Sequence, residues 1–164
     1  MKLMMTEFKK NVIVIIRGDS MKISTKGRYA LRLMIDLAEN QDQGKISLKD
    51  ISKRQEISVK YLEQIVSPLT KAGLIKSTRG SQGGYSLVYP AEKYTPKDIL
   101  RVVEGPVACV SCLETEKNLC PRYSECPTIS FYEGLNKVIN DYLESYTLRD
   151  LLEMKRSKTW DYII

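Results

Sequence analysis

Histidine is absent from this sequence of 164 residues. An enzyme that uses an imidazole as its general base is therefore excluded, as is a metal site that uses an imidazole as a ligand. The sequence also shows no paired catalytic carboxylates and no glycine-rich phosphate loop, because its one cluster of glycines lies in a short turn. We predict that the chain is not an enzyme.

Long apolar runs are absent as well. The run over residues 12–16 is shorter than the apolar core of about 7 to 15 residues in a signal peptide. No stretch approaches the roughly 20 apolar residues that span a bilayer. We therefore expect a cytoplasmic protein, in which thiols stay reduced and disulfides are rare.

The first 20 residues do not resemble the pattern that follows them. Residues 17–20 can be encoded by a ribosome-binding sequence at a suitable distance from the codon of Met21, so we expect Met21 to be the natural start. The alternative is an ordinary N-terminal extension over residues 1–20, with an edge strand over residues 12–16.

Positive charge is concentrated early in the chain, whose formal net charge is +6. Residues 22–90 hold 12 lysines and arginines against 6 aspartates and glutamates, whereas residues 91–164 hold 10 against 12. A basic module joined to a slightly acidic one favours a polyanionic partner for the first. The alternative is that the lysines only form a solvated face.

Apolar spacing predicts three helices in the basic half. The first carries apolar residues over 30–38, the second runs from the capping Ser47 to about Gln55, and the third runs from the capping Ser58 to Gly73. The expected buried side of the third helix consists of Leu62, Ile65, Val66 and Leu69. Two short helices joined by a tight turn are typical of a helix-turn-helix.

The outward face of the third helix suits a DNA major groove. It is expected to carry Lys60, Tyr61, Glu63, Gln64 and Ser67. Gln64 can hydrogen-bond an adenine edge, and Lys60 a guanine or a phosphate. Glu63 can accept from a cytosine amino group, and Tyr61 can contact a phosphate or a thymine methyl. For an isolated amphipathic helix, a solvated face would be the simpler explanation.

The next segment favours DNA binding. Two strand-favouring runs over residues 74–79 and 85–89 flank a turn with three glycines, which predicts a β-hairpin. A hairpin directly after a helix-turn-helix is the winged-helix order. Arg79 can enter a minor groove, and Ser81 and Gln82 can reach phosphate or sugar. The alternative is a purely structural hairpin.

The sequence closely resembles one winged-helix family in the segments KISTKGRYALRLMIDLA, SLKDISKRQEIS, YLEQIVSPLTKAGLIKSTRG and GGYSL. This family contains the iron-sulfur cluster regulator IscR, the cysteine metabolism repressor CymR and the nitric-oxide-sensing repressor NsrR. The resemblance extends from Met21 to about Met154. It implies a homodimeric bacterial transcription factor that binds double-stranded DNA. We include as further candidate DNA contacts Thr25, Lys26, Arg28 and Ser58.

We predict a mostly α-helical fold with a small β-hairpin. A winged helix-turn-helix DNA-binding domain over residues 21–94 would precede a dimerisation region over residues 95–154, with a tail over residues 155–164. Within that region, Thr95 and Pro96 begin a helix that Gly105 ends, and residues 105–127 form a cysteine loop.

A long amphipathic C-terminal helix is expected after Pro127. Its apolar stripe is Ile129, Tyr132, Leu135, Val138, Ile139, Tyr142, Leu143 and Tyr146. The stripe is too apolar for a lone surface helix, so we expect it to pack against a second copy in a homodimer. Such a dimer would bind a pseudo-palindromic operator. The alternative is packing within its own chain.

The four cysteines are spaced Cys109-x2-Cys112-x7-Cys120-x5-Cys126. A structural zinc site usually shows two close pairs, and only the first pair here is close, so zinc is less favoured. Soft thiolates also select iron-sulfur clusters. A redox thiol pair, or no bound metal, is the remaining alternative.

The family resemblance implies that three cysteines, Cys112, Cys120 and Cys126, hold a [2Fe-2S] or [4Fe-4S] cluster. The fourth ligand departs from the family. The histidine of the cluster regulator would fall at Ile129, and the acidic residue of the nitric-oxide sensor would fall at Arg28. Cys109 is therefore our candidate for the fourth ligand.

Three functions follow from these observations. The leading hypothesis is a dimeric DNA-binding regulator, in the simplest case a repressor, that senses iron-sulfur or redox status through the cluster. The second is a repressor of cysteine metabolism controlled by a protein partner such as cysteine synthase, because the tail ending in Tyr162, Ile163 and Ile164 resembles that of the cysteine repressor. The third is a metal or redox module that does not bind DNA.

Overall fold

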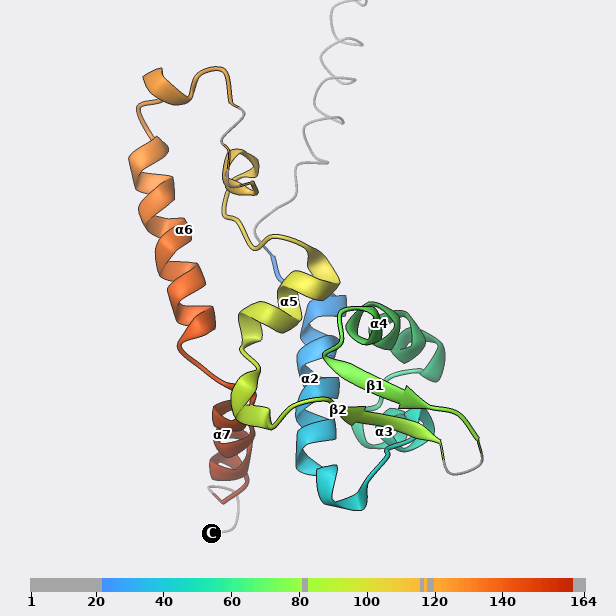
Figure 1. The fold of residues 1–164 in the computed structure, drawn as a ribbon. Coiled ribbons are helices and arrows are strands. Elements are labelled where there is room, and N and C mark those ends of the chain that lie inside the picture. Colours follow the sequence, from blue (N-terminus) through green and yellow to red (C-terminus); the bar gives the residue numbers. More distant parts are fainter. Residues whose placement is uncertain (1–21, 81–82, 116, 118–119, 161–164) are drawn as a thin grey trace, which may run out of the picture.

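A computed structural model describes residues 22–80, 83–115, 117 and 120–160 (Figure 1). The predicted N-terminal extension and Met21 lie outside the described residues. The α-helices are α2 (Thr25–Glu39), α3 (Leu48–Gln55), α4 (Val59–Lys71), α5 (Pro96–Glu104), α6 (Ile129–Glu144) and α7 (Leu148–Trp160). The strands are β1 (Ile75–Thr78) and β2 (Gly84–Leu87), and the short 3-10 helices are η1 (Gln41–Gln43), η2 (Ala91–Lys93), η3 (Ser111–Leu113) and η4 (Tyr123–Glu125). No helix in this part of the chain is long and apolar enough to cross a membrane.

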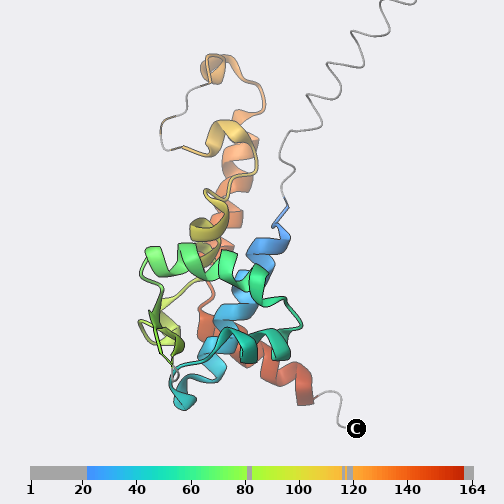
Figure 2. The same cartoon turned by 90° about the vertical axis from the view of Figure 1, so that its right-hand side faces the viewer.

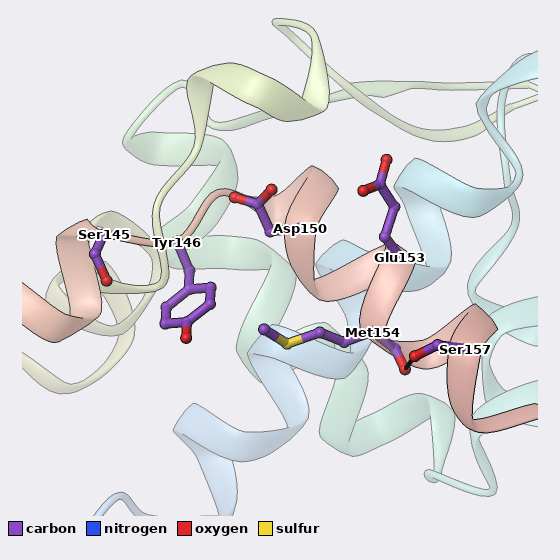
Figure 3. A pocket seen from close by; sticks show the side chains of 6 residues that line it. All are labelled: Ser145, Tyr146, Asp150, Glu153, Met154 and Ser157. Carbon is purple, nitrogen blue, oxygen red and sulfur yellow. Dashed lines mark hydrogen bonds between the residues drawn. The ribbon is translucent and has the colours of Figure 1, made fainter.

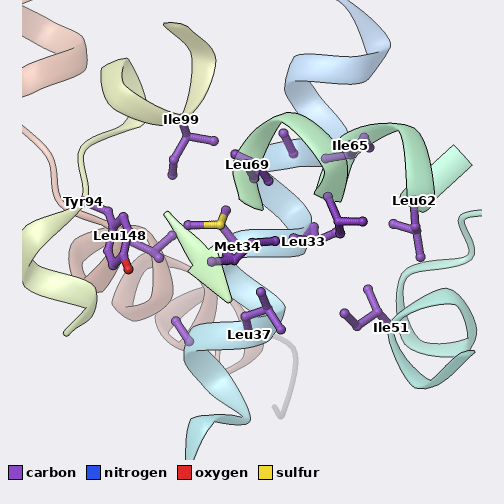
Figure 4. Close-up of a cluster of buried hydrophobic side chains, with 14 of the residues drawn as sticks. Leu33, Met34, Leu37, Ile51, Leu62, Ile65, Leu69, Tyr94, Ile99 and Leu148 are labelled. Atoms are coloured by element: carbon purple, nitrogen blue, oxygen red, sulfur yellow. The ribbon is translucent and has the colours of Figure 1, made fainter. Parts of the chain in front are cut away.

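Helix α2 is the central element of the fold, and α3, α4, α5 and α7 all pack against it (Figure 1). It begins at Thr25, earlier than the apolar pattern from Ala30 suggested, because the Ser24 side chain caps it by accepting from the amide of Gly27 at 3.2 Å. Its buried face points into a core that also includes Ile51, Leu62 and Leu69 (Figure 4).

The predicted helix-turn-helix is confirmed. Ser47 caps α3 and Ser58 caps α4, each by accepting a hydrogen bond from a backbone amide of the first turn. Between the helices, Glu56 adopts the left-handed conformation with φ 54°, which reverses the chain. Gly73 follows α4 with φ 72°, as expected for the residue that ends a helix.

The hairpin is a two-stranded antiparallel sheet whose register pairs Ile75 with Leu87 and Thr78 with Gly84. It is joined to the loop before α3 by a bridge between Ile46 and Tyr85, with N–O distances of 2.9 and 2.8 Å. A Cβ atom at Gly84 would lie 2.7 Å from the Ile46 carbonyl oxygen, so glycine permits this close approach of two backbones. The predicted mostly α-helical fold with a small hairpin is confirmed.

Helices α5 and α7 belong to the same core as the winged helix. Ile99 of α5 and Leu148 of α7 are fully buried with the α2 residues (Figure 4). The sequence analysis assigned both segments to the dimerisation region. The boundary near residue 94 is therefore not a boundary of packing.

Helix α6 stands apart from this core, together with the cysteine loop (Figures 1 and 2). None of its residues is buried. The predicted long helix is wrong in one respect: α6 ends at Glu144, so Tyr146 does not lie on it. The helix ends there because Thr147 and Asp150 cap a separate helix, α7. The Asp150 carboxylate accepts a hydrogen bond from the Thr147 amide at 2.7 Å.

Candidate DNA-binding surface and cysteine loop

The outward face of α4 carries the predicted base-contacting side chains. Lys60, Glu63 and Gln64 are exposed on the first two turns, after the capping Ser58. Tyr61 differs from its predicted outward position, because it is half-buried against the core. Its ring meets the ring of Tyr29 on α2 edge to face, with centroids 5.6 Å apart.

A buried carboxylate fixes the helix-turn-helix to α2. Asp36 on α2 is 1% exposed, and it accepts from Arg54 Nε at 3.0 Å, from Arg54 Nη2 at 2.6 Å and from Gln55 Nε2 at 2.9 Å. The hydrogen bonds that Arg54 donates to Asp36 raise the pKa of Arg54 above its ordinary value. A buried charge needs such partners. The end of α3, and with it the turn before α4, is therefore held in place.

Arg32 extends this network toward the recognition helix. Its Nε donates to Gln55 Oε1 at 3.1 Å, a second nitrogen donates to the Gln55 carbonyl, and its guanidinium carbon lies 5.3 Å from the centre of the Tyr29 ring. A continuous set of contacts thus runs from Asp36 through Gln55, Arg32 and Tyr29 to Tyr61. The sequence analysis missed Asp36, Arg32 and Tyr29, although an aspartate within the apolar pattern of the first helix was a visible signal.

The wing lies on the same side of the molecule as α3 and α4, away from α6 (Figures 1 and 2). Arg79 is exposed directly after β1, and Gly80 beside it has φ 110°. The other predicted wing contacts, Ser81 and Gln82, lie outside the described residues. The structure thus places the described wing candidate, Arg79, at the exposed end of β1.

The start of α2 is tied to the start of the cysteine loop. Ser24 donates from its amide at 2.9 Å and from its hydroxyl at 2.8 Å to Glu104 Oε1, at the last residue of α5. Gly27 leaves room for this carboxylate, because a Cβ atom there would lie 1.9 Å from Glu104 Oε1. The predicted DNA contacts Thr25, Lys26 and Arg28 lie on this same turn, and Arg28 donates to the Thr25 hydroxyl at 3.1 Å.

The first part of the cysteine loop is docked on α6. The amide of Cys109 donates to Asn136 Oδ1 at 3.2 Å, and its thiol donates to the Tyr132 carbonyl at 3.4 Å. One helical turn further, Asn140 Nδ2 donates to the Val107 carbonyl at 3.1 Å. Cys109 is thereby held against the N-terminal half of α6.

Cys126 lies at the N-terminus of α6. Its sulfur is 3.5 Å from the Thr128 hydroxyl. That contact and the amides of Thr128 and Ile129 lower the pKa of the Cys126 thiol below its ordinary value. Cys109 and Cys126 therefore both contact the first turns of the same helix.

The remaining cysteines, Cys112 in η3 and Cys120, lie between Cys109 and Cys126 in the sequence of the loop. All four are half-buried, and none forms a disulfide. Four soft thiols on one segment suit an iron-sulfur cluster in their donor chemistry. Within the described ranges, however, no three cysteine, aspartate or glutamate side chains are grouped closely enough to hold a metal ion. The predicted ligand set is not assembled at one point.

The outer face of α6 is apolar. Phe131, Val138 and Tyr142, spaced seven and four residues apart on one face, are 68%, 64% and 63% exposed. The predicted stripe thus divides in two, because the half-buried Ile129, Tyr132 and Leu143 turn toward their own chain. Phe131 was missing from the prediction.

A pocket at the junction of α6 and α7 is separate from these features (Figure 3). Its lining consists of Ser145, Tyr146, Asp150, Glu153, Met154 and Ser157. Hydrogen bonds from the amide and hydroxyl of Thr147 lower the pKa of Asp150. This carboxylate is therefore engaged in capping α7. Among the described residues, none of the predicted DNA contacts or cysteines lines the pocket.

The sequence and the fold are similar to those of known regulators. Residues 23–154 match the model of the Rrf2 family, described as an iron-dependent transcriptional regulator. The chain belongs to the Rrf2 family. It is 45% identical over 131 residues to the HTH-type transcriptional regulator CymR of Bacillus subtilis, covering 80% of this chain and 89% of that one.

Solved structures of Rrf2-family regulators agree with this assignment. T. potens IscR is similar with a TM-score of 0.65 and 40% identity, over 82% of this chain and 88% of that chain. The structure of CymR, the global cysteine regulator of B. subtilis, is similar with a TM-score of 0.63 and 44% identity, over 81% and 97%. The predicted family and winged-helix fold are confirmed, and the chain is a DNA-binding transcriptional regulator rather than an enzyme. The alternative of a module that does not bind DNA is not supported.

Proposed function

We propose that this Rrf2-family protein acts in the cytoplasm as a homodimer on a pseudo-palindromic operator and represses transcription. Helix α4 enters the major groove with Lys60, Glu63 and Gln64, and the wing places Arg79 at the minor groove. The observation that carries this proposal is the exposed polar row on α4. The buried Asp36 cluster fixes the turn that precedes this row.

The dimer is supported by the outer face of α6. Three large apolar side chains, each more than 60% exposed on one stripe, are unusual on a helix that faces only water. A second copy related by a two-fold axis would cover the same stripe on both chains. The two α4 helices would then bind half-sites about one helical turn of DNA apart.

Operator binding by point variants tests the DNA contacts. Gln64→Ala and Arg79→Ala should each weaken operator binding by about 1–3 kcal/mol. Gln41→Ala is the matched control, because Gln41 is also exposed but lies in η1. Titration by fluorescence anisotropy at fixed salt measures all three. Unchanged operator binding by Gln64→Ala and Arg79→Ala would contradict the proposed DNA-binding surface.

We propose further that the cysteine loop holds an iron-sulfur cluster with Cys112, Cys120 and Cys126, and that Cys109 supplies the fourth thiolate. When bound, the cluster would supply redox and oxidant-sensitive chemistry. The contacts of Cys109 with Tyr132 and Asn136 support its part, because they hold it beside the helix that begins after Cys126. The zinc alternative uses the same thiols.

The route from the loop to the DNA would pass through Glu104. This residue directly precedes the loop and binds the first turn of α2 through Ser24. A change in the loop that moves Glu104 would therefore shift the helix turn that carries Thr25 and Arg28. The cluster can alter DNA binding only if it favours one of two such arrangements.

Anaerobic purification tests the cluster. The wild-type protein should contain iron and acid-labile sulfide and absorb visible light. Cys109→Ser and Cys126→Ser should each lose the iron, the sulfide and the absorbance. Ser111→Ala is the control within the loop. Zinc without sulfide would support the zinc alternative, and full iron and sulfide retention by Cys109→Ser would exclude Cys109 as a ligand.

A second candidate function is control of cysteine metabolism through a partner such as cysteine synthase. It is favoured by the 45% identity with CymR. The tail residues Tyr162, Ile163 and Ile164 lie outside the described residues. Binding of cysteine synthase to the full chain, lost on deletion of Ile164, would support this function. Absence of binding by the full chain would reject it.

A further inference from the structure

Tyr94, between η2 and α5, is buried with only 1% of its surface exposed. Its ring lies beside Leu148 of α7 in the core (Figure 4). A phenol hydroxyl in apolar surroundings is costly unless it is hydrogen-bonded. A phenylalanine would fill this space without that cost, so the hydroxyl itself requires an explanation.

The Tyr94 hydroxyl has three backbone partners at the base of the hairpin. It accepts from the amides of Val88 at 3.0 Å and Tyr89 at 2.7 Å, and it donates to the Leu74 carbonyl at 2.8 Å. Leu74 directly precedes β1 and Val88 directly follows β2. Burial raises the pKa of Tyr94 above its ordinary value, so the hydroxyl keeps the proton that it donates. One hydroxyl thus joins both chain ends of the wing.

The backbone around Tyr94 attaches this hydroxyl to two helices. The Tyr94 carbonyl accepts from the amide of Leu148, the first residue of α7, at 2.8 Å. The next residue, Thr95, caps α5 in a reciprocal pair with Asp98. The base of the wing is therefore connected to α5 and α7, which both pack on α2.

The hairpin depends on such attachments for its direction. A two-stranded hairpin alone is marginally stable. Its other bridge to the domain joins Tyr85, within β2, to Ile46. Core packing of Ile75 and the contacts of the strands with α2 and α4 also hold the hairpin. The Tyr94 hydroxyl adds the hydrogen bonds that fix both chain ends at its base.

We propose that the Tyr94 hydroxyl is a positioning group that sets the angle of the wing and so places Arg79 against the minor groove. The inference rests on the wing contact of the proposed function. It also gives α5 and α7 a part in DNA binding, because Tyr94 joins both helices to the base of the wing.

A double-mutant cycle on operator binding tests this role. Tyr94→Phe keeps the ring and removes the three hydrogen bonds, and it should weaken operator binding about threefold to tenfold. Arg79→Ala should weaken binding by about tenfold in the wild-type chain and by about threefold or less in the Tyr94→Phe chain. Gln64→Ala, on α4, should have the same effect in both chains. Tyr89→Phe is the matched control and should bind like the wild type, because its side chain is exposed.

The outcomes separate the inference from the function on which it rests. If Arg79→Ala has an equal effect in both chains, the hydroxyl has only a structural role and the inference is overturned. If Arg79→Ala has no effect even in the wild-type chain, the proposed wing contact fails and the inference falls with it. If Tyr94→Phe does not fold, hydrogen exchange of the wild-type protein decides. Protection of the Tyr89 amide comparable to that of Tyr85 supports the inference, and exchange at the rate of an exposed amide overturns it.

Discussion

Helices α2 and α6 are of similar length, 15 and 16 residues, and both are amphipathic, yet they differ in what covers them. On α2, seven residues are buried, among them the charged Asp36. On α6 no residue is buried, and Phe131, Val138 and Tyr142 are each more than 60% exposed. The comparison shows that one chain completes the core of its DNA-binding half and leaves the apolar face of its other half open.

Truncation of the α2 core should have the largest effect on stability. Leu33 is fully buried, so Leu33→Ala should lower the free energy of unfolding by about 3–5 kcal/mol. Leu31 on the same helix is half-buried, and Leu31→Ala should cost roughly half as much. Urea unfolding measures both. Equal losses in the free energy of unfolding would contradict the assignment of the buried face of α2.

Removal of the partner of Asp36 should have the next largest effect. Arg54→Ala leaves a carboxylate that is 1% exposed without its main partner, and should cost about 3 kcal/mol. On α6, Lys137 pairs with Asp141 at the surface, and Lys137→Ala should cost about 0.5 kcal/mol or less. Thermal melts of both variants at equal protein concentration test this difference. Similar losses of stability in the two variants would contradict it.

A charge on the outer face of α6 should affect association rather than folding. Val138→Lys should weaken dimerisation by roughly 2 kcal/mol, because a charge would be buried at the two-fold interface. Ser130→Lys is the control, since Ser130 is exposed but lies off the apolar stripe. Sedimentation equilibrium distinguishes the two variants. A Val138→Lys chain that associates like the Ser130→Lys chain would show that this face is not the dimer contact.

A small gain in stability is expected at the helix-turn-helix. Glu56 has a left-handed backbone with φ 54°, which a glycine adopts more easily. Glu56→Gly should therefore raise the free energy of unfolding by about 0.5–1 kcal/mol, without a change in operator affinity. Urea unfolding with an operator titration tests this. A loss of stability would show that the Glu56 side chain has a favourable contact.

Local signals made the DNA-binding half predictable from the sequence. Caps such as Ser47, Ser58 and Thr95 act within three residues of themselves, and the glycines of the turn mark the hairpin. The Asp36–Arg54 pair was missed because its partners are 18 residues apart and only the folded chain brings them together. Leu148 and Tyr94 were missed for the same reason.

The other half was less predictable. Apolar periodicity identified α6, but it cannot show which of two apolar faces the chain itself covers, so Phe131 was omitted. The continued apolar pattern hid the end of the helix, although Thr147 followed by Asp150 is a local cap signal. The ligand set of the cysteine loop stays a prediction, because the geometry of a loop around a cluster is not encoded in cysteine spacing alone.

A hydroxyl-radical footprint on the operator tests most directly whether α4 and the wing read DNA while α6 joins two copies. The wild-type protein should protect two half-sites related by a two-fold axis and centred about one helical turn apart. Val138→Lys should lose this paired protection at concentrations where the wild type gives it, and Ser130→Lys should keep it. A single asymmetric footprint, or an unchanged footprint with Val138→Lys, would contradict the division between the two halves of the chain.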